Sequence, residues 1–569
     1  MAKRGVGYAN GFRPVSKAGT RHSSGRICFV SCCMLHVLGT LGRLPNRRLW
    51  RLIPGLLLVV CAGLQRPASA QTDPVPVGQA ANQDGASPAF SATQPSPDRG
   101  RDLNAGQEHV VHRFEVQGGQ SLPALRCPPP VRVRPRPGAG SPPPPAPGGS
   151  AAAGSAEEIV PLSPAEEKDM LAQALAPPDA RELARLKPPA DRLGALQARL
   201  TEAANQGGPR VALWGGSHMA AEFFATEIRR ALQAPWGPGG VGHTHLLRGR
   251  PGIRLPMDAV LCRQGWKEEI APRAPGATDL DAGAGLYALV SQPAAQLEAD
   301  WQSLPADQQP TELTLHVLQQ ESGGSFDLWI DNALLGRIET SGPRKVVAVK
   351  VISRAPIARL MVKPSGDAPV KLLGLYADTA RGAVLDNFGI AGASGAFWLH
   401  VPAELLKQSQ ALRPYDLIML AYGTNDVTGP QWDPAGYRAK FEQTLKVVRQ
   451  IHPEAACVLI TPGDRVTSQV VRKTIRKGNR NQVVRQVVYD LRTFPERHAQ
   501  AAQIQAELGA AQGCLTWDMS LAMRQRGGAW AMMKASPPLM APDLIHLTPA
   551  GYREMGREFV EWLRLPAAR

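Results

Sequence analysis

The chain has 569 residues, which is too long for one ordinary hydrophobic core and predicts two to four units, some of them without a fold. Its formal net charge is +16, but residues 1–66 hold eleven Lys or Arg residues and no Asp or Glu, so the rest of the chain carries only +5. The basic character is mostly a property of the N-terminus, and we expect no nucleic-acid partner.

Residues 1–70 are predicted to be a targeting segment. A basic stretch precedes the apolar run at 52–64, and the sequence ASA at 68–70 is typical of a signal-peptidase site. The run is short for a membrane span. We therefore expect export to the periplasm or the cell envelope. An uncleaved N-terminal signal-anchor and a later start at Met34 are the alternatives.

Two segments separate this region from the first strand. Residues 71–155 are dominated by Pro, Gly, Ser, Ala and Gln and are predicted to be a disordered linker, because they cannot bury enough apolar surface to offset the entropy of ordering. Residues 156–205 are predicted to be a helical lead-in. Ser163 and Glu166 are spaced as a capping box, and a second helix is expected at about 190–205.

Four of the eight cysteines lie beyond residue 70, and no C-x-x-C pair occurs among them, so the sequence shows neither a zinc site nor a redox motif. Export would permit disulfides. For Cys457 and Cys514 the sequence leaves two alternatives, a disulfide and two buried free thiols.

The remaining sequence has two patterns. In residues 206–244 and again in 381–569, apolar strands alternate with amphipathic helices, which predicts an α/β domain with a parallel sheet covered on both faces. Residues 245–380 instead show alternating apolar and polar residues with Gly and Asn turns. This pattern predicts an antiparallel β-sandwich inserted into the α/β domain.

Three motifs follow predicted strands of the α/β domain, where open parallel sheets place their sites. "GGSH" contains Ser217, "AYGTNDV" contains Asn425, and "APDLIHLTPAGY" contains Asp543 and His546. A carboxylate can hold an imidazole in the tautomer that accepts a proton from serine. Taken singly, each motif also has a purely structural interpretation as a turn or a loop.

Together and in this order, the motifs resemble the SGNH (GDSL-type) hydrolase family, and most closely its two-domain bacterial peptidoglycan O-acetylesterases. The resemblance runs from about 207 to 565. It includes "DNFGIAGASG" with Gly392, His218 after the serine and Asp426 after "GTN". It implies a flavodoxin-like three-layer α/β/α fold with the β-sandwich inserted between the first and second motifs.

The resemblance also implies a mechanism without a metal or cofactor. Ser217, His546 and Asp543 would form the catalytic triad, and the Ser217 N–H, the Gly392 N–H and the Asn425 amide would form the oxyanion hole. The implied reaction removes O-acetyl groups from a cell-envelope polysaccharide, with peptidoglycan as the leading candidate. Acyl transfer by the same triad and a non-catalytic wall-binding protein are the alternatives.

One residue departs from the family pattern. The family reads Gly-Asp-Ser-His, whereas Gly216 stands in place of the aspartate, which supports the nucleophile loop through hydrogen bonds in the family. Glycine adds backbone freedom before the nucleophile. We therefore expect the Ser217 loop to be held less firmly than in relatives.

Two further sets of residues have alternative interpretations, and the protein is expected to be a monomer. The aromatic residues of the predicted sandwich could stack on sugar rings or belong to the core: Trp266, Tyr287, Phe326 and Trp329. The basic stretch 465–485 is predicted to be a solvated helical face, or else a contact for an anionic envelope polymer. The residues of that contact would be Arg465, Arg472, Lys473, Arg476, Lys477, Arg480 and Arg485.

Overall fold

The computed structural model describes residues 110–119, 121–127, 158–271 and 280–566. The predicted targeting segment and most of the predicted linker lie outside these ranges. None of the helices in the described ranges is both long and apolar enough to cross a membrane.

A five-stranded parallel sheet forms the centre of the α/β domain. Its strands follow the order β13-β3-β14-β15-β18, and every neighbouring pair is parallel. Almost every residue of these strands is buried, as expected for a sheet covered on both faces. The strands are β3 (Arg210–Gly215), β13 (Val384–Asn387), β14 (Leu417–Ala421), β15 (Ala456–Ile460) and β18 (Leu515–Trp517).

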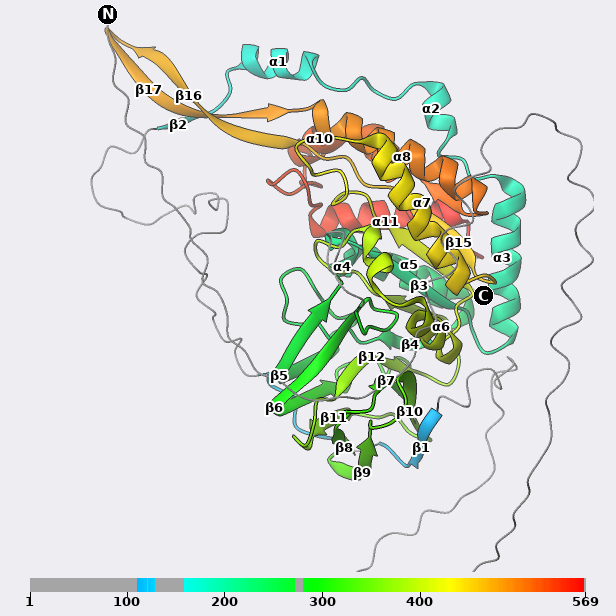
Figure 1. Ribbon diagram of the computed structural model, residues 1–569. Coiled ribbons are helices and arrows are strands. Elements are labelled where there is room, and N and C mark those ends of the chain that lie inside the picture. Colours follow the sequence, from blue (N-terminus) through cyan, green and yellow to red (C-terminus); the bar gives the residue numbers. More distant parts are fainter. Residues whose placement is uncertain (1–109, 120, 128–157, 272–279, 567–569) are drawn as a thin grey trace, which may run out of the picture. The chain divides into compact units, whose positions relative to one another are not determined.

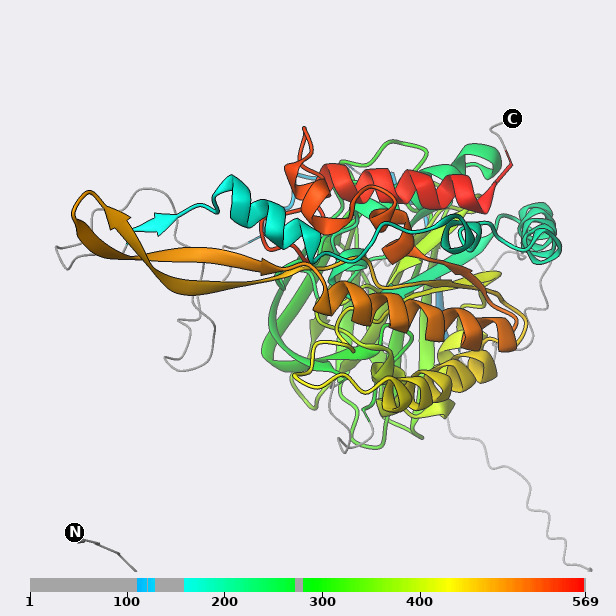
Figure 2. The ribbon, with the colours of Figure 1, turned by 90° about the horizontal axis from the view of Figure 1, so that it is seen from above.

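Helices cover the two faces of this sheet, so the predicted three-layer α/β/α arrangement is confirmed (Figures 1 and 2). Val211 and Leu213 of β3 pack with α3 (Ala190–Asn205), α5 (Phe223–Trp236) and α11 (Pro549–Leu563). Ala212 and Trp214, on the other face, join a cluster with residues of the remaining long helices. These are α6 (Ala403–Leu412), α7 (Pro434–Ile451) and α8 (Thr493–Ala511), together with the 3-10 helix η2 (Gly395–His400).

The segment before β3 contains α1 (Pro164–Ala172), α2 (Ala180–Ala184) and α3. Ser163 and Glu166 form the predicted capping box, in which each side chain accepts the other residue's backbone N–H. The short helices α9 (Met519–Arg524) and α10 (Gly528–Lys534) lie between β18 and α11 in the chain.

The strands between β3 and β13, together with β1 from before β3, form a second sheet, drawn below the parallel sheet in Figure 1. Its pairs are antiparallel except β1 with β10, and β6 pairs with β12 through one half and with β11 through the other. The predicted sandwich is thus one continuous network of ten strands. They are β1 (Val110–Val116), β4 (Gly240–His243), β5 (Val260–Ile270), β6 (Tyr287–Asp300), β7 (Glu312–Gln319), β8 (Ser325–Ile330), β9 (Ala333–Glu339), β10 (Lys345–Ser353), β11 (Arg359–Pro364) and β12 (Lys371–Asp378).

Two predicted boundaries are corrected by this sheet. β4 was expected in the α/β segment 206–244 but pairs with β12. β1 lies inside the predicted disordered linker 71–155, yet it pairs with β10, and Phe114 packs against the core. The composition of the whole linker concealed this short strand, in which residues 112–116 alternate between partly buried and exposed positions.

The described chain contains one disulfide at the second sheet and one at the parallel sheet. Cys127 bonds Cys262 and thereby ties the segment after β1 to β5. Cys457 in β15 bonds Cys514, which directly precedes β18, so the interpretation of these two as free thiols is wrong.

The sugar-stacking interpretation of the sandwich aromatics is also wrong for three of the four residues. Tyr287 and Phe326 have no exposed surface and Trp266 is buried, so none of them presents a ring face to a ligand. Trp329 is partly buried, and its indole N–H lies inside the protein.

A buried ion-pair network joins the two sheets. Arg413, at the end of α6, binds Asp378 of β12 at 2.7 Å and Asp386 of β13 at 3.0 Å. All three side chains are buried, so removing one partner would leave an uncompensated charge. The network therefore fixes the second sheet against the strand next to β3.

The basic stretch forms a β-hairpin rather than the predicted helix. Strands β16 (Thr467–Lys477) and β17 (Arg480–Asp490) pair antiparallel, and β2 (Ile159–Val160) adds a third strand. The hairpin extends away from the parallel sheet in Figure 2. Its β-branched and basic residues stand in adjacent pairs, as in VVRKTIRK, and this repeat of four lies close to the helical period. In the hairpin the side chains of residues 471–476 instead alternate between partly buried and exposed positions.

Candidate active site

Ser217 lies at the carboxyl end of β3, the second strand of the parallel sheet. The strand ends at Gly215, and Ser217 is the first residue of the one-turn helix α4 (Ser217–Ala220). Main-chain N–H groups of Met219 and Ala220 donate to the Gly216 carbonyl oxygen and close this turn. The serine side chain therefore projects where open parallel sheets bind ligands.

Asp543 and His546 lie on the loop between α10 and α11. The Ser217 Oγ is 2.8 Å from His546 Nε2, and His546 Nδ1 is 2.8 Å from Asp543 Oδ2. The other oxygen of Asp543 accepts the main-chain N–H groups of Ile545 and His546 at 3.0 and 2.9 Å. The structure thus brings the three predicted catalytic residues into one hydrogen-bonded chain.

The electrostatics of this chain suit a serine nucleophile. Partial burial acts to raise the pKa of Asp543, but hydrogen bonds from the side chain and main chain of His546 and from Ile545 lower that pKa to about 2. Asp543 is therefore ionised at neutral pH. An ionised carboxylate on Nδ1 leaves Nε2 free to accept the serine proton.

The triad is open to solvent. The side chains of His546 and Asp543 are 39% and 47% exposed. A polymer can therefore reach the nucleophile without the opening of a buried chamber.

The predicted oxyanion donors lie on the loops after the two strands that flank β3. Gly392 follows β13 and has a φ of +84°, which a residue with a side chain rarely adopts. Asn425 follows β14, and its amide donates to the Ala393 carbonyl oxygen at 2.9 Å. An amide has two N–H groups, so one bond to Ala393 leaves a second donor.

Gly216 lies against these donors. A Cβ atom built on Gly216 would be 3.0 Å from the Asn425 amide nitrogen and 3.5 Å from the Ala393 oxygen. Five predicted site residues thus come from three adjacent loops and the loop before α11: Ser217, Gly392, Asn425, Asp543 and His546.

Three contacts from other elements hold the short helix that carries Ser217. Asn387 donates to the Met219 carbonyl oxygen at 2.8 Å, and the Arg254 N–H donates to that of Ala220 at 3.0 Å. Tyr552 Oη lies 3.1 Å from Nδ1 of His218. Asn387 and Tyr552 belong to motifs that carried the family resemblance, whereas nothing in the sequence singled out Arg254.

His218 is a supporting residue rather than a proton carrier. Burial and the neighbouring His546 lower the pKa of His218 to about 3, so its imidazole is neutral at physiological pH.

Asp426 has a structural role in the loop after β14, where its carboxylate accepts the Gly423 N–H at 3.1 Å. Burial raises the pKa of Asp426 to about 6.

Arg465 does not belong to the basic hairpin. It lies on the loop after β15, and its guanidinium group is 4.6 Å from the centre of the Phe494 ring. The next residue, Val466, donates its N–H to the carbonyl oxygen of Leu544 in the catalytic loop at 3.0 Å. Arg465 is thereby separated from the other six residues of the predicted polymer contact.

Comparison with known families agrees with this geometry. The model of the GDSL-like Lipase/Acylhydrolase family matches residues 365–554, a segment that includes Gly392, Asn425, Asp543 and His546. The chain contains a GDSL-like lipase/acylhydrolase domain. Ser217 lies upstream of the matched segment, because the second sheet separates β3 from β13 in the sequence.

The chain is also similar to several solved structures. A structure described as "Peptidoglycan O-acetylesterase in action" shares 18% identity, with 65% of this chain and 94% of that chain covered and a TM-score of 0.48. A family two carbohydrate esterase from Cellvibrio japonicus shares 12% identity over 54% of this chain and 100% of its own, with a TM-score of 0.21. No curated protein matches the sequence.

The family match indicates an ester-hydrolysing enzyme. Within the described ranges, no cluster of three His, Cys, Asp or Glu side chains is arranged to hold a metal ion.

Proposed function

We propose that this protein is a serine esterase that removes O-acetyl groups from a cell-envelope polysaccharide, with peptidoglycan as the leading candidate. The observation that carries the proposal is the hydrogen-bonded chain from Asp543 through His546 to Ser217. The exposure of the triad fits a polymeric substrate. The resemblance of the motifs to peptidoglycan O-acetylesterases and the expected export signal support the choice of polymer.

In the first half of the reaction, His546 Nε2 takes the proton of Ser217 while Oγ attacks the carbonyl carbon of the ester. The negative charge that develops on the carbonyl oxygen is stabilised by the N–H groups of Ser217 and Gly392 and by the Asn425 amide. A single donor of this kind contributes about 3 kcal/mol to transition-state stabilisation. His546 then returns the proton to the departing sugar hydroxyl.

In the second half, a water molecule loses its proton to His546 and attacks the acyl-serine. Collapse of the second tetrahedral intermediate releases acetate and restores Ser217. Asp543 remains ionised throughout and stabilises the imidazolium form of His546. A glycan hydroxyl in place of water would give acyl transfer, the alternative outcome of the same chemistry.

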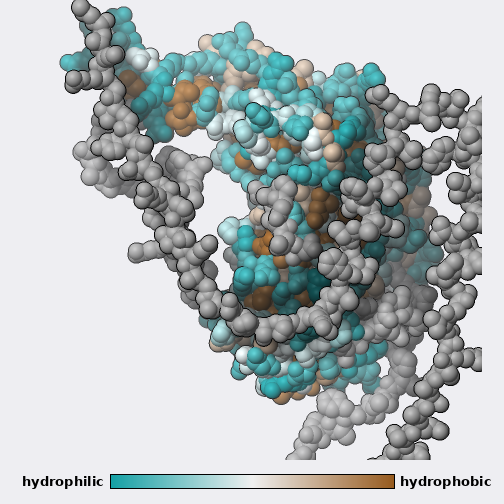
Figure 3. Space-filling model, in the orientation of Figure 1, coloured by the Kyte–Doolittle hydropathy of each residue, from teal (hydrophilic) through white to brown (hydrophobic). Residues whose placement is uncertain are grey.

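We propose that the β16–β17 hairpin contacts an anionic envelope polymer. Its exposed face presents Arg472, Arg476 and Arg485, with Lys477 and Arg480 next to the turn and no acidic residue between positions 467 and 489. Figure 3 shows the outer part of the hairpin as mainly hydrophilic surface. Lys473 and Lys477 already pair with Glu166 and Glu158, so their contribution to such a contact is smaller.

The test is acetate release from purified O-acetylated peptidoglycan by the full chain and by Ser217→Ala. The full chain is required, because a fragment beginning at residue 156 would lose β1 and the disulfide to Cys262. Release that is abolished by Ser217→Ala supports the esterase. Acetate appearing only on an added glycan acceptor would favour the transferase, and no turnover of any acetyl ester would favour the wall-binding alternative.

A further inference from the structure

A basic cleft lies beside the nucleophile, at the start of α5. Its volume is about 540 Å³, and its lining begins at Ala221, directly after α4. At 1.5 Å per residue, this point is about 6 Å along the helix from Ser217. The seventeen lining residues include five arginines and only two acidic residues, so the cleft has an excess of positive charge.

Among the residues that the structure describes, three of the five arginines have no carboxylate partner. Arg229 pairs with Glu222 and Arg230 pairs with Glu227. Across the described part of the chain, no ion pair is formed by the others, which are Arg248, Arg254 and Arg553.

The two acidic residues of the lining do not neutralise these cations. Glu222 is buried and accepts hydrogen bonds from both Arg229 and Asn387, so its carboxylate is already engaged. Asp258 is exposed and makes no ion pair in the described ranges. A net positive charge therefore remains in the cleft.

Arg254 and Arg553 converge on one aromatic ring. Their guanidinium carbons lie 4.9 and 5.3 Å from the centre of the Phe223 ring. Two positive charges near the same ring repel each other, and an anion bound in the cleft lowers the energy of both. Guanidinium groups bind carboxylates and phosphates in a planar, bidentate geometry, and of these two groups the carboxylate is the one carried by the glycan of the proposed function.

The cleft is structurally coupled to the catalytic serine. The Arg254 main chain donates to Ala220 at the end of α4. The Phe223 ring stacks on Tyr552 at a centroid distance of 6.4 Å, and Tyr552 is hydrogen-bonded to His218. A ligand held by these arginines is therefore positioned relative to Ser217.

We propose that the cleft binds a carboxylate group carried by the acylated polymer, and that Arg254 and Arg553 are specificity-determining residues for acidic glycan. The proposal rests on the proposed esterase function. The carboxylate can belong to a sugar or to a peptide attached to it.

The experiment measures equilibrium binding to the full chain by calorimetry, with probes that contain no O-acetyl ester. The first probe is the disaccharide of N-acetylglucosamine and N-acetylmuramic acid, whose lactyl group has a free carboxylate. The second is N,N′-diacetylchitobiose, which lacks that group. A third arm uses the disaccharide with its peptide attached, so that the carboxylates lie on the peptide.

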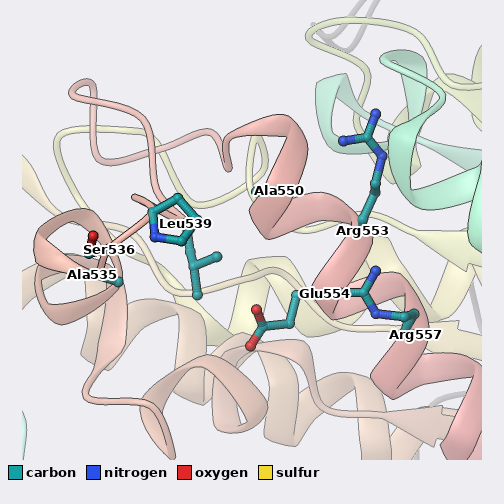
Figure 4. Close-up of a pocket in the computed structure, with 8 residues that line it drawn as sticks. Ala535, Ser536, Leu539, Ala550, Arg553, Glu554 and Arg557 are labelled. Carbon is teal, nitrogen blue, oxygen red and sulfur yellow. The ribbon is translucent and has the colours of Figure 1, made fainter.

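The variants are Arg254→Gln and Arg553→Gln, with Arg557→Gln as the matched control. Arg557 lies one helical turn after Arg553 and lines a different pocket of about 360 Å³, shown in Figure 4 with Arg553 and Glu554. Its removal deletes the same charge from the same helix without changing the lining of the cleft.

We expect the acidic disaccharide to bind about tenfold more tightly than diacetylchitobiose at low salt. High salt, Arg254→Gln and Arg553→Gln should each remove most of this difference, whereas Arg557→Gln should preserve it. Tighter binding of the third probe than of the first would assign the carboxylate to the peptide. If a variant fails to fold, the loss of the affinity difference at high salt still tests the proposal on the wild-type protein.

Equal affinity for the first two probes together with no gain for the third would overturn the proposal, as would equal losses in Arg553→Gln and Arg557→Gln. Binding requires no turnover, so the two hypotheses fail separately. Selective binding without acetate release would refute the esterase and leave the carboxylate site standing. Acetate release without selective binding would support the esterase and refute the carboxylate site.

Discussion

Gly216 gives a sharp test of the oxyanion geometry. Its φ of −83° and ψ of −154° are open to any residue, so Gly216→Ala adds a methyl group without straining the backbone. The new Cβ would lie 3.0 Å from the Asn425 amide nitrogen, whereas ordinary contact begins at 3.4 Å. The amide must therefore retreat by about 0.4 Å.

A displacement of about 1 Å costs on the order of 100-fold in rate, so this shift should lower kcat about fivefold, which is roughly 1 kcal/mol of transition-state stabilisation. KM for a small acetyl ester and the melting temperature should stay unchanged, because neither substrate binding nor the core is altered. The assay is steady-state hydrolysis of a chromogenic acetyl ester, with circular dichroism to confirm the fold.

Gly216→Asp has the same Cβ, so its kcat divided by that of Gly216→Ala reports only the effect of the carboxylate. A ratio above one would show that the family aspartate still anchors the loop in this protein. A kcat of Gly216→Ala within twofold of the wild type would refute the reasoning that residue 216 crowds the oxyanion donor.

Three other perturbations have defined outcomes. Ser217→Ala should lower kcat at least about 10⁴-fold, and residual hydrolysis above one per cent of wild type would contradict the triad. Burial lowers the pKa of His218 to about 3, so protons bind the unfolded chain first as the pH falls below about 6.5, and the stability present at neutral pH is progressively lost. Burial also lowers the pKa values of His243, His316 and His452 to about 3. The melting temperature should therefore fall steadily below about pH 6. A constant melting temperature down to pH 5 would be inconsistent with neutral buried imidazoles. Replacing both Cys457 and Cys514 by serine should lower the free energy of unfolding by about 4 kcal/mol in urea titrations, since the bridge spans 57 positions, and an unchanged midpoint would argue against it.

The parallel sheet and the triad could be predicted because their signals are local. Each catalytic residue follows an apolar strand or precedes a capped helix, and Asp543 and His546 are only three residues apart. Contacts between segments far apart in the chain leave no such local pattern in the sequence. The sequence gives no spacing rule that pairs Cys127 with Cys262 across 135 positions or that aligns β1 with β10.

The hairpin and Arg254 show two other features that could not be predicted from the sequence. Val470 and Val483 are exposed, so the apolar pairs of β16 and β17 do not mark a core, and their spacing resembles a helical repeat. Arg254 supports α4 through its main-chain N–H, a contact that any residue except proline could make. Sequence reasoning therefore selected the side chains that the structure brings together and missed part of the framework that holds them.

The position of β3 in the chain has a consequence for how the enzyme folds. Its neighbours β13 and β14 follow only after the whole second sheet, and Ser217 and His546 are 329 positions apart. During synthesis or refolding, β3 has no strand partner until those later segments are present. Pairings of such high sequence separation are formed slowly, and unpaired apolar strands associate readily with other chains. The order of elements therefore makes assembly of the catalytic centre a late event and makes the folding yield depend on early completion of the second sheet.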